Sequence, residues 1–164
     1  MKRNSFLLTV LALMFLGTTS AWSQRAKDIT IQFRINAEAI FHSGDVEGNS
    51  SLRDNNSGKS GNGRLADFQS TAYPSKFVNW EILDDGPHRG NYQVKFLDFP
   101  WSGNVQAFAQ NPIPGGGWKA KVKVEDGAGD GELKYTIRFT IKSMTTGEER
   151  TFELDPKIRI ISSP

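Results

Sequence analysis

The chain of 164 residues contains no cysteine. This absence excludes disulfides, thiolate metal ligands and a thiol nucleophile, so stability has to come from packing. Histidine is nearly absent too, with His42 and His88 alone. The sequence has neither a G-x-S-x-G elbow nor an H-E-x-x-H helix motif, and we expect the protein not to be an enzyme. Carboxylate pairs of the kind that glycosidases use stay open, because their separation does not show in a sequence.

The N-terminus predicts a secretory signal peptide over residues 1–23. Lys2 and Arg3 precede an apolar run over residues 6–17, and small residues follow; this order is typical of cleaved export signals. Cleavage after Ser23 is favoured over cleavage after Ala21. The run is shorter than the roughly 18 residues that a membrane-spanning helix needs. We therefore expect a secreted or periplasmic protein without a transmembrane segment after cleavage.

Charge balance excludes one class of partner. The whole chain has 20 basic and 18 acidic residues. Loss of residues 1–23 removes Lys2 and Arg3 and no acid, which leaves 18 basic against 18 acidic residues. A formally neutral chain lacks the overall positive charge of nucleic-acid-binding domains, so no nucleic-acid partner is expected.

Hydrophobic alternation with a period of two runs through residues 24–164, which we interpret as one domain of about 140 residues. The pattern predicts an all-β fold: an antiparallel β-sandwich, immunoglobulin-like or cupredoxin-like, of about seven to nine strands, with a small barrel as the alternative. One helical turn is expected near residues 64–69. The alternating runs lie at residues 29–35, 78–82, 92–96, 118–124, 133–141, 152–154 and 157–161.

Two hairpins follow from the spacing of these runs. Residues 78–82 and 92–96 flank a turn at 85–90, and residues 118–124 and 133–141 flank a glycine-rich turn. Apolar complementarity in the second hairpin predicts Val124 opposite Leu133. A further turn around residues 145–148 continues the meander, and the same complementarity predicts Phe139 opposite Leu154 and Ile141 opposite Phe152.

Residues 42–64 interrupt this pattern. Glycine, serine and asparagine replace apolar residues there. A segment of this composition buries too little surface to offset its ordering entropy, so we expect a long flexible loop.

A Trp-containing strand, the turn with His88 and the closing run FELDPKIRII (residues 152–161) together resemble the cupredoxin-like domains of secreted bacterial proteins. The resemblance covers residues 28–161. Copper-binding members use two histidines and a cysteine, usually with a weak methionine ligand, and the missing thiolate excludes a blue-copper site.

A weaker metal site is an alternative for the two histidines. His42 and His88 with nearby carboxylates form a candidate copper or zinc site; a solvated turn at residues 85–90 explains His88 as well and is favoured. The acidic segment at residues 125–132 is a candidate for calcium, although it lacks EF-hand spacing. We expect no resident cofactor.

Basic side chains give the first candidate binding surface. In the predicted hairpin register, one outer stripe carries Lys119, Lys121, Lys123, Lys134 and Arg138. Such a stripe fits an anionic partner such as an acidic polysaccharide or an envelope lipid. The alternative is a solvated face whose lysines discourage aggregation.

Aromatic residues give the second candidate. Phe99, Trp101 and Trp118 lie in segments rich in proline and glycine, where aromatic rings either stack on sugars or plug the ends of a sandwich. We therefore predict an exported, non-enzymatic binding module, with a carbohydrate or cell-envelope component as the preferred partner. The alternatives are metal handling by His42 and His88, and a structural or assembly role at the cell surface with a protein partner.

Overall fold

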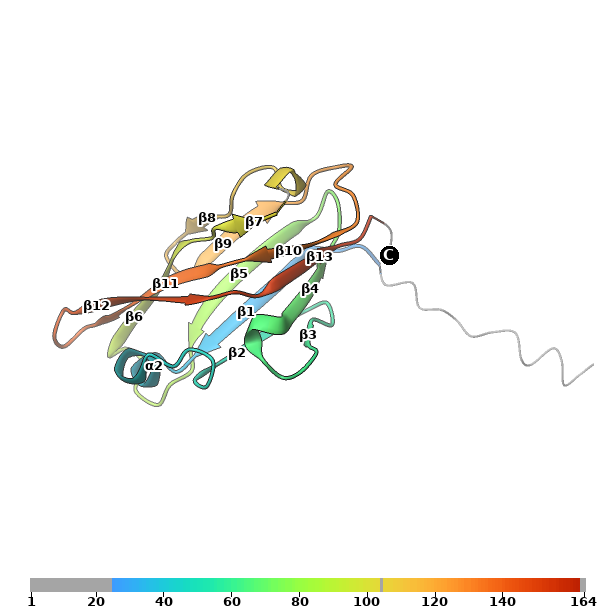
Figure 1. Ribbon diagram of the computed structural model, residues 1–164. Coiled ribbons are helices and arrows are strands. Elements are labelled where there is room, and N and C mark those ends of the chain that lie inside the picture. The colour runs from blue at the N-terminus through green and yellow to red at the C-terminus, as the bar shows by residue number, and fades with distance from the viewer. Residues whose placement is uncertain (1–24, 104, 163–164) are drawn as a thin grey trace, which may run out of the picture.

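Strands make up most of the described chain, which comprises residues 25–103 and 105–162 of the computed structural model. The predicted signal peptide lies outside these residues. The all-β sandwich is confirmed (Figure 1), with thirteen strands in the described part because several are only two or three residues long. No helix in the described part is long and apolar enough to span a membrane. In chain order the elements are β1 (Ile29–Ile35), α2 (Ala37–Ser43), β2 (Ser50–Asp54), β3 (Lys59–Ser60), the 3-10 turn η1 (Leu65–Asp67), β4 (Phe68–Ala72), β5 (Phe77–Asp84), β6 (Tyr92–Asp98), β7 (Trp101–Ser102), the 3-10 turn η2 (Val105–Ala107), β8 (Ile113–Gly115), β9 (Lys119–Lys123), β10 (Gly131–Tyr135), β11 (Ile137–Ser143), β12 (Glu149–Leu154) and β13 (Lys157–Ile160).

The first sheet has the strand order β2-β1-β5-β9-β8. β1 and β5 run parallel, and the other neighbours are antiparallel. Alternate residues of β1, from Ile29 to Ile35, are at most 1% exposed, and their neighbours Val78, Trp80 and Ile82 are buried on the same face. The other face of this sheet is turned to solvent.

Two sheets form the second layer, with orders β3-β4-β13-β10-β7 and β12-β11-β6. Most neighbours are antiparallel, and β13 with β4 is parallel. A single residue separates β10 from β11, and two residues separate β12 from β13. Two long segments therefore run through both sheets (Figure 1). The core lies between this layer and the first sheet; for example, the rings of Phe33 and Phe139 meet edge to face with centroids 5.1 Å apart.

Helix α2 closes one end of the sandwich. The Asn36 side chain accepts the backbone N–H of Ala39, which caps the helix N-terminus. Gly44 ends the helix at φ 75°, a left-handed conformation that favours glycine. The helix buries Ala37, Ile40 and Phe41. The single turn expected near residues 64–69 is also confirmed as η1.

Both predicted hairpins that involve the first sheet are wrong. β9 pairs with β5 and β8, whereas β10 pairs with β13 and β7, so Val124 does not lie opposite Leu133. Likewise β5 pairs with β1 and β9, whereas β6 pairs with β11. In both cases the connection crosses from one layer to the other.

The hairpin of β11 and β12 is confirmed around residues 144–148. Its register is shifted by two residues from the sequence prediction: Leu154 lies opposite Ile137 and Phe152 opposite Phe139. A shift of two keeps every side chain on its predicted face.

The prediction of a loop over residues 42–64 is wrong, because β2 and β3 lie within it. Leu52 is buried in the core, and hydrogen bonds hold the polar residues that follow it. The Asp54 carboxylate accepts the N–H groups of Asn56 and Gly58 and the hydroxyl of Ser70. Asn56 is 3% exposed, and its amide donates to the carbonyl of Thr71. This network links the polar segment to β4.

Candidate functional site

Three lysines of β9 point to solvent from the outer face of the first sheet. Ala120 and Val122 are buried, so the alternation of the strand turns Lys119, Lys121 and Lys123 outward, where all three are exposed. β9 is held between β5 and β8. Its outer side chains therefore lie beside those of two neighbouring strands.

The register extends this face across the sheet. Lys119 lies opposite Glu81, Glu81 opposite Gln32, and Gln32 opposite Arg53, in one row from β9 to β2. The next row places Lys121 opposite Asn79 and Asn79 opposite Thr30. Arg34 is on the same face of β1. We call this surface the basic face; its basic side chains are Arg34, Arg53, Lys119, Lys121 and Lys123.

Few of these charges are neutralised. Glu81 is the single acid among the outward strand residues of the face, and its carboxylate lies 3.8 Å from Lys119 Nζ. Arg34 pairs with Asp85 at 2.6 Å. Within the described residues, Arg53, Lys121 and Lys123 have no ion-pair partner. The face therefore carries a net positive charge.

Aromatic rings lie under two of the lysines. Lys121 Nζ is 3.8 Å from the centroid of the Phe77 ring, and Lys119 Nζ is 4.1 Å from that of Trp118. Both distances are within the range of cation–π attraction. Trp118 is 42% exposed and Ile113 on β8 is 60% exposed, so the edge of the basic face at β8 and β9 also presents apolar surface.

The three aromatic residues predicted as a sugar platform are not brought together at the surface. Phe99 is 3% exposed and packs against Trp80 and Phe96. Trp101 is half-buried and stacks on Phe108 with centroids 4.4 Å apart. Phe99 and Trp101 therefore fill the interior of the sandwich, and Trp118 alone of the three is exposed.

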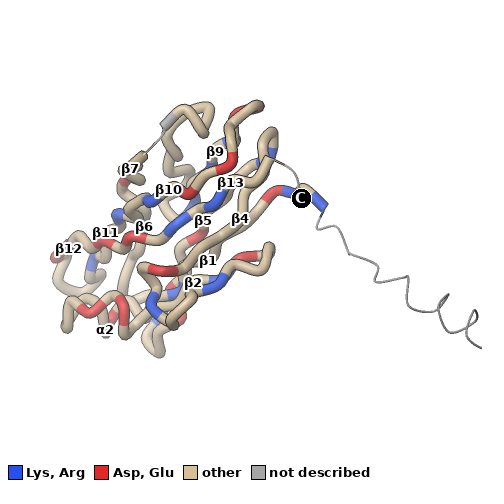
Figure 2. The backbone as a smooth tube through the Cα atoms, turned by 45° about the vertical axis from the view of Figure 1, so that its right-hand side comes forward, with Lys and Arg blue, Asp and Glu red and all other residues tan. Residues whose placement is uncertain are grey.

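The predicted basic stripe is divided between the two layers. Lys134 and Arg138 belong to β10 and β11 in the second layer, and not to the strand partners of β9. Arg138 pairs with Glu153 at 2.6 Å and Asp98 at 3.2 Å, and the hydrogen bond to Glu153 raises the pKa of its guanidinium. Lys134 lies 3.9 Å from Asp155. Basic and acidic residues alternate along this layer (Figure 2).

The two histidines have different partners. His42 Nε2 lies 3.1 Å from the hydroxyl of Tyr92, and His88 Nδ1 lies 2.5 Å from Glu38 Oε2. The hydrogen bond to Glu38 raises the pKa of His88. Among residues 25–103 and 105–162, no group of three or more histidine or acidic side chains is arranged to hold a metal ion. The structure thus does not assemble the predicted copper or zinc ligands.

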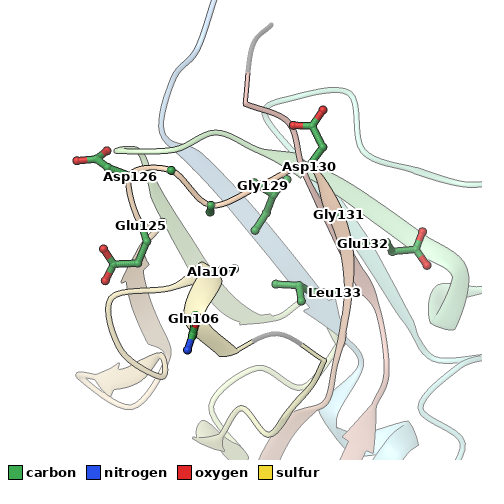
Figure 3. A pocket seen from close by; sticks show the side chains of 12 residues that line it. Gln106, Ala107, Glu125, Asp126, Gly129, Asp130, Gly131, Glu132 and Leu133 are labelled. Atoms are coloured by element: carbon green, nitrogen blue, oxygen red, sulfur yellow. The ribbon is translucent and has the colours of Figure 1, made fainter.

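The acidic segment at residues 125–132 borders a pocket of about 410 Å³. The carboxylates of Glu125 and Asp126 lie on one side of the pocket and those of Asp130 and Glu132 on the other (Figure 3). Asp126 accepts the hydroxyl of Ser75, and Asp130 accepts the N–H and hydroxyl of Ser162, which lower its pKa. The segment does not converge on a calcium site.

Arg34 and Arg53 are members of the basic face that the sequence analysis did not identify. The outward position of Arg34 follows from the alternation of residues 29–35, but its neighbours depend on pairing over long sequence separations. Arg53 lies in the segment predicted as a loop. Recognition of β2 as a strand was the missing step.

No family model matches the chain, and no curated protein is similar to it in sequence. Among solved structures, the chain is similar to the crystal structure of the inclusion body protein PixA from Burkholderia cenocepacia, with a TM-score of 0.60 and 10% identity. The match covers 85% of this chain and 99% of that one. At this identity the similarity shows a shared fold alone.

Proposed function

We propose that this protein is an exported, non-enzymatic β-sandwich module that binds an anionic component of the cell envelope through its basic face. The observation that carries the proposal is the charge distribution. The charged residues at the outward strand positions of the first sheet are five basic residues and one acid. The chain without residues 1–23, by contrast, is formally neutral.

The shape of the face favours an extended ligand. Alternate lysines on β9 are roughly 7 Å apart, and the three strand spacings from β9 to β2 span about 14 Å. Positive charge is thus spread over an open sheet surface. A compact ligand prefers a concave pocket that surrounds it, whereas a linear polyanion makes many contacts with such a surface.

The chemistry of the face supports binding more than catalysis. Its polar side chains are lysines, arginines, neutral amides, the hydroxyls of Thr30 and Ser51, and Glu81, whose carboxylate is engaged by Lys119 and by the Gln32 amide. None of these groups forms a nucleophile and base pair of the kind that hydrolases require. Ionic attraction and hydrogen bonding are the interactions that such a surface offers.

A structural or assembly role is a second candidate, favoured by one observation. β12 pairs only with β11, so its six residues form a free strand edge within the described chain, and free edges are templates for pairing with another chain. The neighbour in fold is named an inclusion body protein. Sedimentation of the purified mature chain tests this: concentration-dependent oligomers support assembly, and a monomer at all concentrations contradicts it.

The anion-binding proposal is tested with residues 24–164 at low salt. The probes are polygalacturonate, polyacrylate and vesicles of phosphatidylcholine with 30% phosphatidylglycerol. We expect submillimolar affinity for at least one probe. The triple change Lys119→Gln, Lys121→Gln and Lys123→Gln is expected to weaken that binding at least tenfold, since the lysines are exposed and lightly paired.

The matched control removes the same charge from the second layer with Lys134→Gln, Lys142→Gln and Lys157→Gln. These lysines lie on β10, β11 and β13. We expect the control to bind like the unchanged protein. Equal losses in the two triple variants would mean that net charge, and not the basic face, governs binding; absence of binding to every probe would end the proposal.

A further inference from the structure

Neutral polar side chains occupy the middle of the basic face. Thr30 and Gln32 on β1 and Asn79 on β5 are half-buried and lie between the lysines of β9 and Arg53 on β2. A surface that attracts anions by charge alone has no need of amides at its centre. The hydrogen bonds of the Gln32 and Asn79 amides indicate which groups a ligand supplies in addition to negative charge.

Each of the two amides uses one of its two N–H groups inside the protein. Asn79 Nδ2 donates to the backbone carbonyl of Ile29 at 3.0 Å, and Gln32 Nε2 donates to Glu81 Oε2 at 3.4 Å. Within residues 25–103 and 105–162, neither Asn79 Oδ1 nor Gln32 Oε1 accepts a hydrogen bond. Each amide therefore has its oxygen and its second N–H left for a ligand, and the oxygen is the group that needs a donor.

Amide oxygens need a donor, which the anionic groups themselves do not provide. Carboxylates and phosphate diesters are acceptors at neutral pH. Sugar hydroxyls donate and accept, and they alternate with the anionic groups along a polyuronate chain. A ligand that combines both therefore satisfies the lysines and the amide oxygens together.

A phospholipid surface matches this face less well. Its phosphates suit the lysines, and the hydroxyls of a phosphatidylglycerol headgroup suit the amide oxygens, so hydrogen-bond donors alone do not separate a lipid from a polysaccharide. Membrane association also gains from apolar side chains that enter the interface. On the basic face, the ring of Phe77 lies beneath Lys121, and exposed apolar groups are confined to the edge at Ile113 and Trp118.

The geometry points to an acidic polysaccharide as the ligand of the basic face, bound by Lys119, Lys121, Lys123 and Arg53 through its carboxylates and by Gln32 and Asn79 through its hydroxyls. This inference rests on the proposed function and deepens it. The exposed ring of Trp118 at the edge adds a surface on which a sugar ring stacks.

Two polymers of like charge separate hydroxyl recognition from simple ionic attraction. Polygalacturonate carries carboxylates and hydroxyls, whereas polyacrylate carries carboxylates alone. The mature chain is titrated with both, at matched carboxylate concentration and chain length, at low salt. We expect about 25-fold tighter binding of polygalacturonate, because two amide oxygens accept a hydrogen bond and each such bond contributes a factor of about five.

Gln32→Met removes the amide while keeping the charge and approximate shape of the side chain. We expect about fivefold weaker binding of polygalacturonate and no change for polyacrylate. The control is Gln69→Met on β4 of the second layer, whose amide likewise donates to a carboxylate, that of Glu132. The control variant should bind both polymers like the unchanged protein.

The outcomes separate this inference from the proposed function. Equal affinity for the two polymers, or equal losses for both in Gln32→Met, overturns the polysaccharide and leaves anion binding standing. Binding to the phosphatidylglycerol vesicles without binding to polygalacturonate overturns it in favour of a lipid surface. Binding to none of the three probes removes the proposed function itself.

Discussion

At the scale of single residues, one buried hydrogen bond joins the two layers. Trp80 belongs to β5 of the first sheet and Tyr135 to β10 of the second layer, and both are at most 1% exposed. The indole N–H donates to the Tyr135 hydroxyl at 3.0 Å. Burial raises the pKa of Tyr135 well above its ordinary value, because the phenolate would be desolvated. The hydroxyl thus stays neutral and fixes the contact of the layers.

Removing this hydroxyl tests its contribution to stability. Tyr135→Phe leaves the ring in place and deprives the buried Trp80 N–H of its acceptor. We expect the free energy of unfolding to fall by about 1–3 kcal/mol, the usual cost of an unpaired buried donor. Urea unfolding followed by tryptophan fluorescence measures it.

Tyr92→Phe is the matched control for that experiment. Its hydroxyl contacts His42 in an exposed hydrogen bond, so water replaces the lost partner. A loss of about 0.5 kcal/mol or less is expected. Equal losses of unfolding free energy in the two tyrosine variants would show that the hydrogen bond between Trp80 and Tyr135 stabilises the fold no more than an exposed one.

At the scale of elements, the short helix α2 is positioned by contacts from several strands and turns. Asp84 at the end of β5 accepts the N–H of Ala37. Arg150 on β12 donates to the carbonyl of Phe41 at 2.7 Å. His88 in the turn between β5 and β6 contacts Glu38. A helix of seven residues is marginal alone, so these contacts and its buried face hold it in place.

The contact between His88 and Glu38 makes this docking depend on pH. Glu38 raises the pKa of His88 in the folded protein. Protonated His88 therefore stabilises the fold; this contribution is full below the unfolded pKa of about 6.5 and is lost as the pH rises through the higher folded value. His88→Gln should lower the melting temperature more at pH 5.5 than at pH 8.5.

The pKa itself is checked by NMR titration of the His88 ring. Glu38→Gln should return the pKa of His88 toward its ordinary value, because the charge and the carboxylate acceptor are both removed. A His88→Gln effect of the same size at both pH values would contradict the role assigned to this contact.

Alternation in the sequence was sufficient to locate most strands and to say which side chains are buried, because a period of two is a local property. β1, β9 and β13 agree with it throughout, and β11 departs from it at Thr140, which is buried. Strand partners were not predictable in the same way. Val122 lies opposite Val78, and nothing local distinguishes that pairing from a hairpin with the next apolar run.

Prediction of the basic face from the sequence was limited in the same way. The outward lysines of β9 were predicted from alternation, but Lys134 and Arg138 were joined to them by a hairpin that does not form. Arg53 was missed because residues 42–64 are polar. That segment is ordered by buried hydrogen bonds to Asp54 and from Asn56, and such bonds leave no hydrophobic pattern to read.

At the scale of the whole molecule, charge is unevenly distributed over the surface, whereas the interior that supplies most of the stability is apolar. Without residues 1–23 the chain is formally neutral, yet the basic face is positive while acids and bases alternate on the second layer (Figure 2). Within the described residues, most cations of the second layer are paired with acids, whereas Lys121 and Lys123 of the basic face are not, so a polyanion is attracted more strongly to the basic face. The interior, by contrast, is apolar and continuous through both layers.

This division predicts that salt separates binding from folding. The charges of the basic face are exposed, and the screening length falls from about 10 Å at 0.1 M salt to about 3 Å at 1 M. Affinity for polygalacturonate should fall at least tenfold between 0.05 and 0.5 M sodium chloride. The melting temperature should shift by only a few degrees, because exposed ion pairs contribute about 0–1 kcal/mol each and packing is insensitive to screening. Titration and thermal unfolding of the same sample at both salt concentrations measure the affinity and the melting temperature. A melting temperature that falls in parallel with the affinity would mean that surface ion pairs, and not the apolar interior, hold the layers together.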